Sequence, residues 1–500
     1  MRFKKVPSLV TLIVSLFSTA TFAQRTDSIP VRHDVTLPQA HKGTLKIDSL
    51  LLDSYVRLPE NIRKFYLEAR SVFEENEVDF TDERIVAAAV KNGIPLISGP
   101  MLGDLKENSV TIWFRPASIN LIEIEIADLA GKETKLYIFN PSVAGQAERI
   151  VLGNLSSATK YSYLMKIQGA EVAKGTFQTT SKTEETSELR LAFASDFHKI
   201  GLHNPNLMDA ILARNPIAML LLGDLAVDDR DTKLSMHRAD YLLRDVSQPW
   251  KKLAANVPLY AAWDDHDYLN NDLSGLPEGV SNEDREALRK LWSENWNNPE
   301  NLEPGIYFNT RIGAVEVIML DTRSFRENDR RGEYNSYLGA AQLNWLKDVL
   351  AKSSAPYMLI TSGTMWSDYI SEGKDSWGTW DTLAREEIYQ LIETENIPGV
   401  LLLSGDRHGA RSFTIPRNPG FEFYEFGPAS LGGVPGPEAI AKDSSKQLFG
   451  YLGLGLKAFG EFTFTMEGSS PQVTFRLIDE YGNIMEEHVL SYDQLIPQNK

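Results

Sequence analysis

The sequence predicts an α/β domain over residues 189–490, preceded by a small β-sandwich over residues 95–180. From residue 189 onwards, short apolar runs that end in polar clusters alternate with helical segments, as in an α/β sheet whose polar residues gather at the carboxyl ends of buried strands. Between residues 95 and 180, apolar and polar residues alternate with a period of two, which is typical of antiparallel strands with one buried face.

The start of the chain has the features of a secretory signal peptide. The first five residues, Met-Arg-Phe-Lys-Lys, form a basic n-region, Leu9–Phe17 is apolar but too short to span a bilayer, and Thr-Phe-Ala at 21–23 resembles a cleavage site before Gln24. We therefore expect residues 1–23 to be removed and the mature protein to be secreted or periplasmic. No later run is long and apolar enough to suggest a transmembrane segment.

Residues 24–94 are expected to form a polar arm followed by a helical segment. Gln24 to about Lys46 is polar and contains prolines, which suggests a mobile arm. Apolar residues then recur at helical spacing, so we expect one helix over residues 59–75 and a second over 82–91.

The expected β-sandwich resembles a fibronectin-III/Ig-like module. Leu155–Tyr163 resembles the approach to the tyrosine corner of such domains. Any other small all-β module fits the alternation equally well. A polar, acidic linker, Ser181–Ser187, separates it from the next domain.

Composition restricts the function. The chain has 500 residues, 42% hydrophobic and 24% charged, which is ordinary for two or three globular domains. The formal net charge of −17, more negative by three units without the leader, argues against a broad nucleic-acid surface. It does not exclude an anionic substrate, because bound metal ions can reverse the local field. With no cysteine there are no disulfides and no thiolate ligands, so any metal must be held by oxygen and imidazole.

The stretch Trp263–Asp267 follows an apolar run and brings three carboxylates and one imidazole to the start of a loop. Carboxylates packed side by side repel one another unless a cation or a proton lies among them. A solvated acidic loop is one interpretation. A metal site with an acid/base histidine is the other, and it requires further ligands elsewhere.

Those ligands are available at the ends of other predicted strands. Apolar runs end near residues 194, 222, 262, 360 and 403, and a helix marked by Leu343, Leu346 and Leu350 lies between the third and fourth. Each of the motifs at these ends is weak alone, but four in succession indicate a shared site. They are Asp196-x-His198, Gly223-Asp224, Asp265-His266-Asp267 and Gly405-Asp406-x-His408.

This series resembles the motifs of the calcineurin-like metallophosphoesterases, and within them the alkaline phosphatase D (PhoD-like) family. The similarity is most specific at Trp263–Asp267 and at the fifth motif, and it extends to Asn271-Asp272, Leu320–Arg323 and Leu338–Leu346. It covers roughly residues 95–490. The resemblance implies a metallophosphoesterase-type four-layer α/β/β/α sandwich after the small β-sandwich, and a dinuclear metal centre.

Carried over position by position, the resemblance implies that Asp196, His198 and His408 hold one metal ion and that Asp224 bridges to a second. Asp265 and Asp406 would hold the second ion, standing where the wider superfamily has Asn and His. The lone His of the superfamily would fall near Thr361–Gly363, where this chain has none. The second site is therefore nearly all oxygen and suits Ca²⁺, Mg²⁺ or Mn²⁺, whereas the first suits Fe, Mn or Zn.

The chain also departs from the founding PhoD pattern. There the first motif carries a Cys where this chain has Asp196 or its neighbour, and a Tyr ligand follows the second motif where this chain has Val227. The metals and ligands of the founding enzymes are therefore not transferred.

The implied activity is hydrolysis of phosphoric esters, as a phosphomonoesterase, a phosphodiesterase or both, by a metal-activated water. His266 would protonate the leaving oxygen, and Asp267 would orient the His266 ring. Arg323 and Arg407 are candidates for a phosphate clamp, or equally for structural ion pairs, and Asn271 is a further candidate for substrate binding.

Two alternatives remain. One is a metal-stabilised binding protein with little turnover, against which the intact His266 and Asp267 count. The other keeps the fold and acts on a phospholipid or nucleotide, as a phospholipase D-like phosphodiesterase. The long loops at 268–282 and 427–446 are where such specificity would be set.

Overall fold

The computed structural model describes residues 29–498 except 132, 183–187, 301–303, 374, 418–419, 437–438, 452–454 and 467–470. The expected signal peptide and most of the expected linker at 181–187 lie outside the described residues. Among the described helices, none has the length and apolar character needed to cross a membrane.

The N-terminal region is more ordered than its composition suggested. Helices α3 (Glu60–Glu75) and α4 (Glu83–Lys91) confirm the two predicted helices. The mobile arm expected up to Lys46 is wrong for its described part, because α1 (Leu37–Lys42) and α2 (Leu45–Leu52) form there. Each begins at a threonine: Thr36 forms a capping box, and Thr44 accepts a hydrogen bond from the N–H of Ile47. These local signals are hidden by the polar composition.

Residues 96–178 form two antiparallel sheets around a shared apolar core. The hydroxyl of Tyr161 accepts a hydrogen bond from the N–H of Ser156, 2.9 Å away, a contact that ties the strand β6 to the loop before it. One sheet has the order β1 (Leu96–Gly103), β2 (Val110–Pro116), β5 (Glu148–Leu152); the other has the order β4 (Thr134–Phe139), β3 (Ile122–Asp128), β6 (Lys160–Ile167), β7 (Ala170–Gln178).

The rest of the chain contains two larger mixed sheets. In the first, β8–β10 are parallel and β18–β20 antiparallel, and in the second, β12, β13, β14 and β16 are parallel. The first has the order β10 (Leu259–Ala262), β9 (Ala218–Leu222), β8 (Leu189–Ala194), β18 (Ala458–Thr465), β19 (Gln472–Asp479), β20 (Ile484–Ser491). The second has the order β11 (Phe308–Ile312), β12 (Val315–Met319), β13 (Tyr357–Ser362), β14 (Val400–Ser404), β16 (Glu422–Gly427), β15 (Arg411–Pro416), β17 (Gln447–Gly450).

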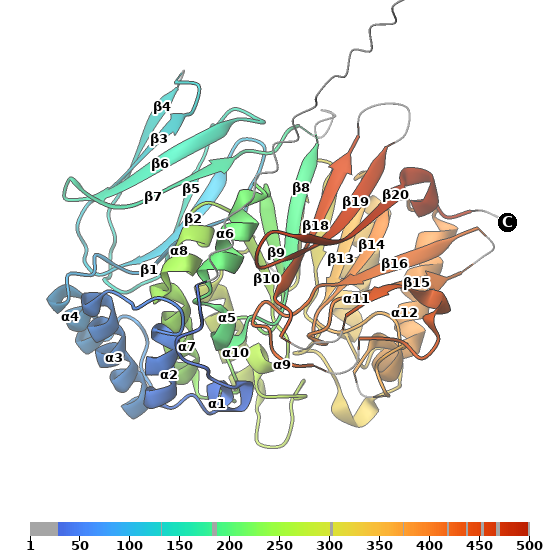
Figure 1. Cartoon of the computed structure of the whole chain (residues 1–500), viewed down its shortest axis with the longest axis horizontal. Helices are drawn as coiled ribbons and strands as arrows, with labels where there is room; N and C mark the ends of the chain where they lie inside the picture. The colour runs from blue at the N-terminus through green and yellow to red at the C-terminus, as the bar shows by residue number, and fades with distance from the viewer. Residues whose placement is uncertain are drawn as a thin grey trace, which may run out of the picture.

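Helices lie on the outer sides of these sheets (Figure 1). On the β8–β10 side are α5 (His198–Gly201), α6 (Pro205–Ala213), α7 (Leu234–Val246), α8 (Gln248–Ala254), α9 (Asp265–Tyr268) and α10 (Asn282–Asn295); on the β12–β14 side are α11 (Gly339–Lys352) and α12 (Trp377–Thr394). The helix marked by Leu343, Leu346 and Leu350 is confirmed as α11.

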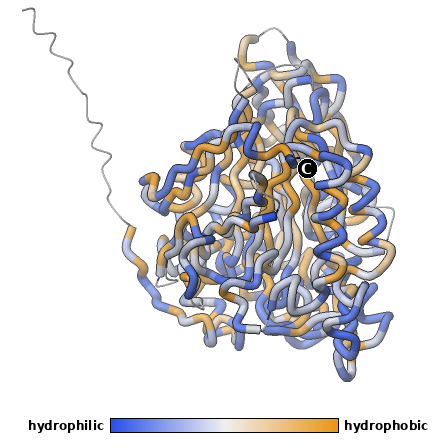
Figure 2. The backbone as a smooth tube through the Cα atoms, turned by 90° about the vertical axis from the view of Figure 1, so that its right-hand side faces the viewer, coloured by the Kyte–Doolittle hydropathy of each residue, from blue (hydrophilic) through white to orange (hydrophobic). Residues whose placement is uncertain are grey.

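Neighbouring residues of the inner strands face different cores. Val317 and Leu359 belong to the core that the two sheets share, whereas Ile318 and Ile360 face the core beneath α11 and α12. This is why the strands are apolar throughout and show no alternation in the sequence. Figure 2 shows hydrophobic segments concentrated at the centre and hydrophilic ones along the outer helices and loops.

The five strands whose ends carry the predicted motifs do not belong to a single open sheet. β8, β9 and β10 lie in the first sheet, and β13 and β14 lie in the second. Backbone bonds hold the ends together: Asp196 N–H donates to Gly223 O at 3.0 Å, and Gly405 N–H donates to Gly363 O at 2.9 Å. Ser195 also forms an isolated parallel bridge with Ser430. Loops from both sheets therefore meet at one place.

Candidate metal centre

The backbone at the strand ends is strained. Five of the six predicted metal ligands have positive φ angles, a conformation that residues other than glycine rarely adopt. Such residues cost on the order of 1–3 kcal/mol each and persist where the surrounding structure enforces them. The five are Asp196 (54°), His198 (42°), Asp224 (53°), Asp406 (69°) and His408 (56°). The exception, Asp265, begins the short helix α9.

The first group of ligand atoms comes from Asp196, His198, Asp224 and His408, which lie within 4.8 Å of one another. Both imidazoles are held at Nδ1: His198 by a carboxylate oxygen of Asp228 at 2.8 Å, and His408 by the carbonyl oxygen of Pro435 at 2.9 Å. A proton on each Nδ1 leaves Nε2 with a free lone pair, as a metal-binding histidine requires. The Nε2 of His408 is 3.5 Å from Asp196 Oδ1.

Two further groups adjoin the first. Asp224 and Asp265 approach a ring nitrogen of His266, and Asp265 also groups with Asp264 and Asp406. Asp224 is common to the first and second groups, and Asp265 to the second and third, so the three form a continuous row. The Oδ2 atom of Asp265 accepts a hydrogen bond from the backbone N–H of Asp272 at 2.5 Å.

The donor atoms in this row fit cations. Four of them are buried and have no hydrogen-bond partner among the described residues, an arrangement that is costly unless another group binds there. They are Asp196 Oδ1, His198 Nε2, Asp224 Oδ1 and Asp265 Oδ1. All are oxygen or imidazole nitrogen, the donors expected for hard and borderline metal ions.

The charges of the row also require compensation. Burial, and then repulsion from Asp265, Asp264 and Asp196, raises the pKa of Asp224 well above its usual range, although His266 opposes this. Burial and the neighbouring carboxylates raise the pKa of Asp406 well above its usual range in the same way. A positive ion among these oxygens would remove this penalty and keep them ionised.

His266 lies at the row, but its orientation has a different cause from the one expected. Its Nδ1 is 2.6 Å from Asp229 Oδ1, so Asp229 orients the ring and leaves Nε2 free. Asp267, predicted to do this, instead accepts the backbone N–H of Leu225 at 3.0 Å and of Asp264 at 3.4 Å. The prediction for Asp267 is wrong because α9 is a single helical turn, in which adjacent side chains diverge.

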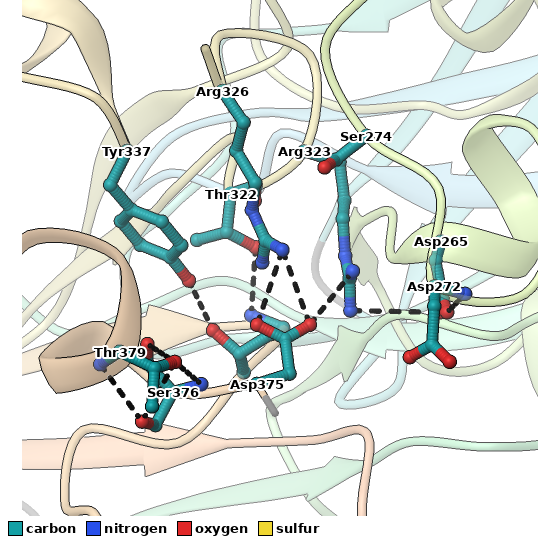
Figure 3. A network of polar contacts seen from close by, with 12 residues as sticks. Asp265, Asp272, Ser274, Thr322, Arg323, Arg326, Tyr337, Asp375, Ser376 and Thr379 are labelled. Carbon is teal, nitrogen blue, oxygen red and sulfur yellow. Dashed lines mark hydrogen bonds and ion pairs between the residues drawn. The ribbon is translucent and has the colours of Figure 1, made fainter. Parts of the chain in front are cut away.

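Arg323 is a structural ion-pair partner in this structure, and its predicted role as a phosphate clamp is not supported. The side chain is fully buried and binds Asp264 through two nitrogens, one of them 2.7 Å from Asp264 Oδ2. Another nitrogen is 2.9 Å from Asp375. Figure 3 shows Arg323 and Arg326 both contacting Asp375, and Arg323 extending towards Asp265. This cation is committed to four carboxylates, since Asp406 is also 3.5 Å away.

The other two substrate-binding candidates lie near the site with polar contacts of their own. Arg407 is buried and donates to the carbonyl oxygen of Ile370 at 2.6 Å. Asn271 donates its backbone N–H to Asp229 at 3.1 Å and its side-chain N–H to Asp272 at 2.9 Å. Asn271 therefore supports the loop that holds His266.

Four residues of the site were not anticipated from the sequence. Asp228 and Asp229 follow Asp224 closely, and a pair of acids just after a ligand motif is a signal that could have identified them. Asp264 fills the space beside Gly363, where a Cβ atom would collide with its carboxylate, so no side chain fits at Gly363 itself. His41, from α1, lies 4.5 Å from His266 between ring centroids, and nothing in the sequence marks it.

The chain is similar to known phosphatases. Residues 222–449 match the family model described as PhoD-like phosphatase. Alkaline phosphatase D of Bacillus subtilis (strain 168) is 24% identical over 192 residues, 32% of this chain and 32% of the relative, so the match spans about a third of that protein.

Two solved structures share the fold. One described as the structure of PhoD aligns with a TM-score of 0.64 at 17% identity, covering 79% of this chain and 89% of its own. The purple acid phosphatase PPD1 from yellow lupin (Lupinus luteus) seeds aligns with a TM-score of 0.59 at 12% identity, covering 79% and 74%. At these identities the similarity concerns the fold alone.

A substitution of Arg323 tests its assignment as a structural cation. Arg323→Ala should lower the free energy of unfolding by about 3–5 kcal/mol, because it leaves buried carboxylates without their partner. Urea denaturation measures this change. Arg330→Ala is the matched control, since the ion pairs of Arg330 are with exposed glutamates and its removal should leave the free energy of unfolding nearly unchanged. Unchanged stability of Arg323→Ala together with a raised KM for a phosphate ester would instead support the clamp.

Proposed function

We propose that this chain, which belongs to the PhoD-like phosphatase family, is a secreted, metal-dependent hydrolase of phosphomonoesters, phosphodiesters or both. The observation that carries the proposal is the continuous row of carboxylates and imidazoles, in which four buried donor atoms have no hydrogen-bond partner among the described residues. A row of this kind lowers the stability of the fold, and it has no structural use without cations.

In this proposal Asp196, His198 and His408 hold one metal ion, and Asp224 is shared with a second. Asp265 and Asp406 complete the second site. Fe, Mn or Zn suits the histidine-containing site, and Ca, Mg or Mn suits the oxygen-rich site. Asp264, whose carboxylate is bound by Arg323, adds a further carboxylate to the second site. It was not among the ligands predicted from the sequence.

When bound, such ions supply positive charge that neutralises phosphate oxygens and makes a water molecule acidic enough to act as a nucleophile near neutral pH. The water oxygen forms a bond to phosphorus while the bond from phosphorus to the alcohol oxygen breaks in line. His266 donates a proton from Nε2 to the leaving oxygen. Asp229 keeps the ring in place through Nδ1, and the burial of His266 excludes competing water.

The finer description of the fold belongs to the same proposal. We assign residues 189–490 to a metallophosphoesterase-type four-layer α/β/β/α catalytic domain and residues 95–180 to a fibronectin-III/Ig-like module. The contact between Tyr161 and Ser156 supports the module, as a tyrosine-corner bond would. Residues 24–94 form the N-terminal segment before it.

Hydrolysis should require metal. Dialysis against a chelator should abolish activity towards nitrophenyl phosphate and bis(nitrophenyl) phosphate, and Ca²⁺, Mg²⁺ or Mn²⁺ should restore it, because the second site is oxygen-rich. Asp224→Asn should lose both bound metal and activity. The matched control is Asp329→Asn at an exposed position, which should lose neither. Full activity of metal-free protein would contradict the proposal.

The same assay, extended to phospholipid and nucleotide esters, separates the alternatives. Metal binding without turnover of any ester indicates the binding protein, and turnover of phospholipids alone indicates a phospholipase D-like phosphodiesterase.

Removal of the His266 imidazole should separate an enzyme from a binder. His266→Ala should retain folding and metal content and lose roughly 10²–10⁴-fold in turnover, the usual worth of general acid–base catalysis. The loss should be largest for alkyl phosphates and smaller for nitrophenyl esters, whose leaving oxygen needs little protonation. Unchanged turnover of alkyl esters would remove His266 from the mechanism, and loss of a metal ion would make it a ligand.

Export should leave a mature protein that begins at or near Gln24. This expectation rests on residues 1–23, in which a basic region is followed by an apolar run and then by a motif that resembles a cleavage site. N-terminal sequencing of the protein recovered from outside the cytoplasm checks this expectation, and a cytoplasmic protein that retains residues 1–23 would refute it.

A further inference from the structure

His41 reaches the candidate metal centre from a segment that lies far outside the matched family domain at 222–449. It belongs to α1, which packs against α5, the helix that begins with His198. Its ring centroid is 4.5 Å from that of His266 and 5.6 Å from that of His198. The side chain is only 18% exposed.

The contacts of His41 are with the two carboxylates that hold the other imidazoles. Its Nδ1 is 3.1 Å from Asp229 Oδ2, while Asp229 Oδ1 binds the Nδ1 of His266. Its Nε2 is 3.8 Å from Asp228 Oδ1, the oxygen that binds the Nδ1 of His198. His41 therefore contacts Asp229 directly and lies beside Asp228 at a distance longer than a hydrogen bond, next to the two carboxylates on which the proposed acid and a proposed metal ligand depend.

Buried ion pairs fix α1 and α2 against the catalytic domain independently of His41. Asp48 of α2 is fully buried and lies 2.9 Å from Arg70 and 3.4 Å from Lys199, the residue after His198. Arg70 also donates to the carbonyl oxygen of Gly43 at 2.8 Å, two residues after His41. Gly43 has a φ of 48°, and a Cβ there would collide with the guanidinium of Arg230. The contacts of Gly43 and Asp48, which follow His41 in the chain, therefore fix the position of His41 independently of its own side chain.

We propose that His41 is a positioning residue for the phosphoesterase reaction. It holds Asp229 so that His266 faces the leaving oxygen, and it supports Asp228, which the backbone N–H of Lys199 also holds, so that His198 faces its proposed metal ion. The inference rests on the proposed function. It also makes the N-terminal helices part of the catalytic site, although they precede the domain that carries the motifs.

The experiment compares three variants of the full-length protein. His41→Ala removes both contacts. His41→Asn keeps an N–H donor close to the position of Nδ1 and so retains the bond to Asp229. His33→Ala is the matched control, since His33 is another histidine of the same segment and is not part of the histidine cluster.

His41→Ala should lower kcat by roughly 10–100-fold, the usual effect of losing a residue that orients a ligand or catalytic group, with KM changed by no more than about threefold. Its affinity for Mn²⁺, titrated by calorimetry, should fall by up to roughly tenfold, because Asp228, which the N–H of Lys199 still holds, loses one neighbouring contact and orients His198 less firmly. The melting temperature should stay close to that of the unmodified protein, since the pairs of Asp48 remain. His41→Asn should recover most of kcat, and His33→Ala should change nothing.

Two results would overturn the inference. In the first, His41→Ala matches the unmodified protein in kcat and in Mn²⁺ affinity. In the second, His41→Ala and His41→Asn lose activity equally and in proportion to a lowered melting temperature, as a purely structural residue would. If the unmodified protein binds Mn²⁺ but hydrolyses no ester, the proposed function fails, and the Mn²⁺ titration still decides the role of His41.

Discussion

Repulsion between buried carboxylates, where the ends of two sheets meet, is the constraint on which the rest of the site depends. Asp224, Asp264, Asp265 and Asp406 lie in one row with little access to water. Several ionised carboxylates cannot share such a space unless positive charge lies among them. The protein supplies part of that charge itself. Arg323 occupies the end near Asp264 and Asp406, and His266 occupies the end near Asp224, where burial lowers its pKa but Asp224 and Asp265 outweigh this and raise the pKa well above its usual range. The unpartnered oxygens between these ends are where the proposed metal ions would complete the balance.

Bringing those groups together also strains the backbone, and the packing of the sheets makes this tolerable. Gly223 and Gly405, just before two ligand positions, allow close approach: a Cβ at Gly223 would lie 2.5 Å from Asp264 Cβ, and one at Gly405 would lie 2.7 Å from Leu222 O. Large apolar cores on both faces of the inner strands hold the loops in place. The positive φ angles of the predicted ligands cost free energy, and the packing of the cores offsets this cost. This pattern is expected of a functional site and not of a loop that only connects strands.

Much of the site could be predicted from the sequence because it depends on a local pattern. Asp196, Asp224 and Asp406 each follow a buried strand, and the carboxyl ends of such strands converge whatever the details of the loops. The same logic could not show that these strands belong to two sheets, since apolar runs carry no record of their partners. The same reasoning gave the wrong role to Asp267, because the direction of a side chain in a single helical turn depends on backbone and side-chain dihedral angles. Asp229, with a φ of 54°, took the place expected for Asp267.

His41 and Arg323 were unpredictable for a different reason. His41 reaches the site through packing that includes a buried pair between Asp48 and Lys199, which joins segments about 150 residues apart, and no short window of sequence contains both. Arg323 could be a clamp or an ion-pair partner, and only its burial among carboxylates distinguishes the two. Long-range ion pairs of this kind are specified by three-dimensional packing, which composition and periodicity do not encode.

The burial of the charged groups inside the site also explains how an acidic protein could act on the proposed anionic substrate. The formal net charge of −17 would repel a phosphate ester if it acted over long distances. At physiological ionic strength, however, exposed charges are screened beyond roughly 8 Å, whereas buried ones are screened much less. The proposed substrate would therefore respond mainly to the groups within the site, namely His266 and any bound ions. Because Arg323 is already committed to Asp264 and Asp375, it can contribute little attraction of its own. Under the proposed function, substrate binding and catalysis would then depend on the same ions, which would couple the affinity of this site for phosphate esters to its metal content.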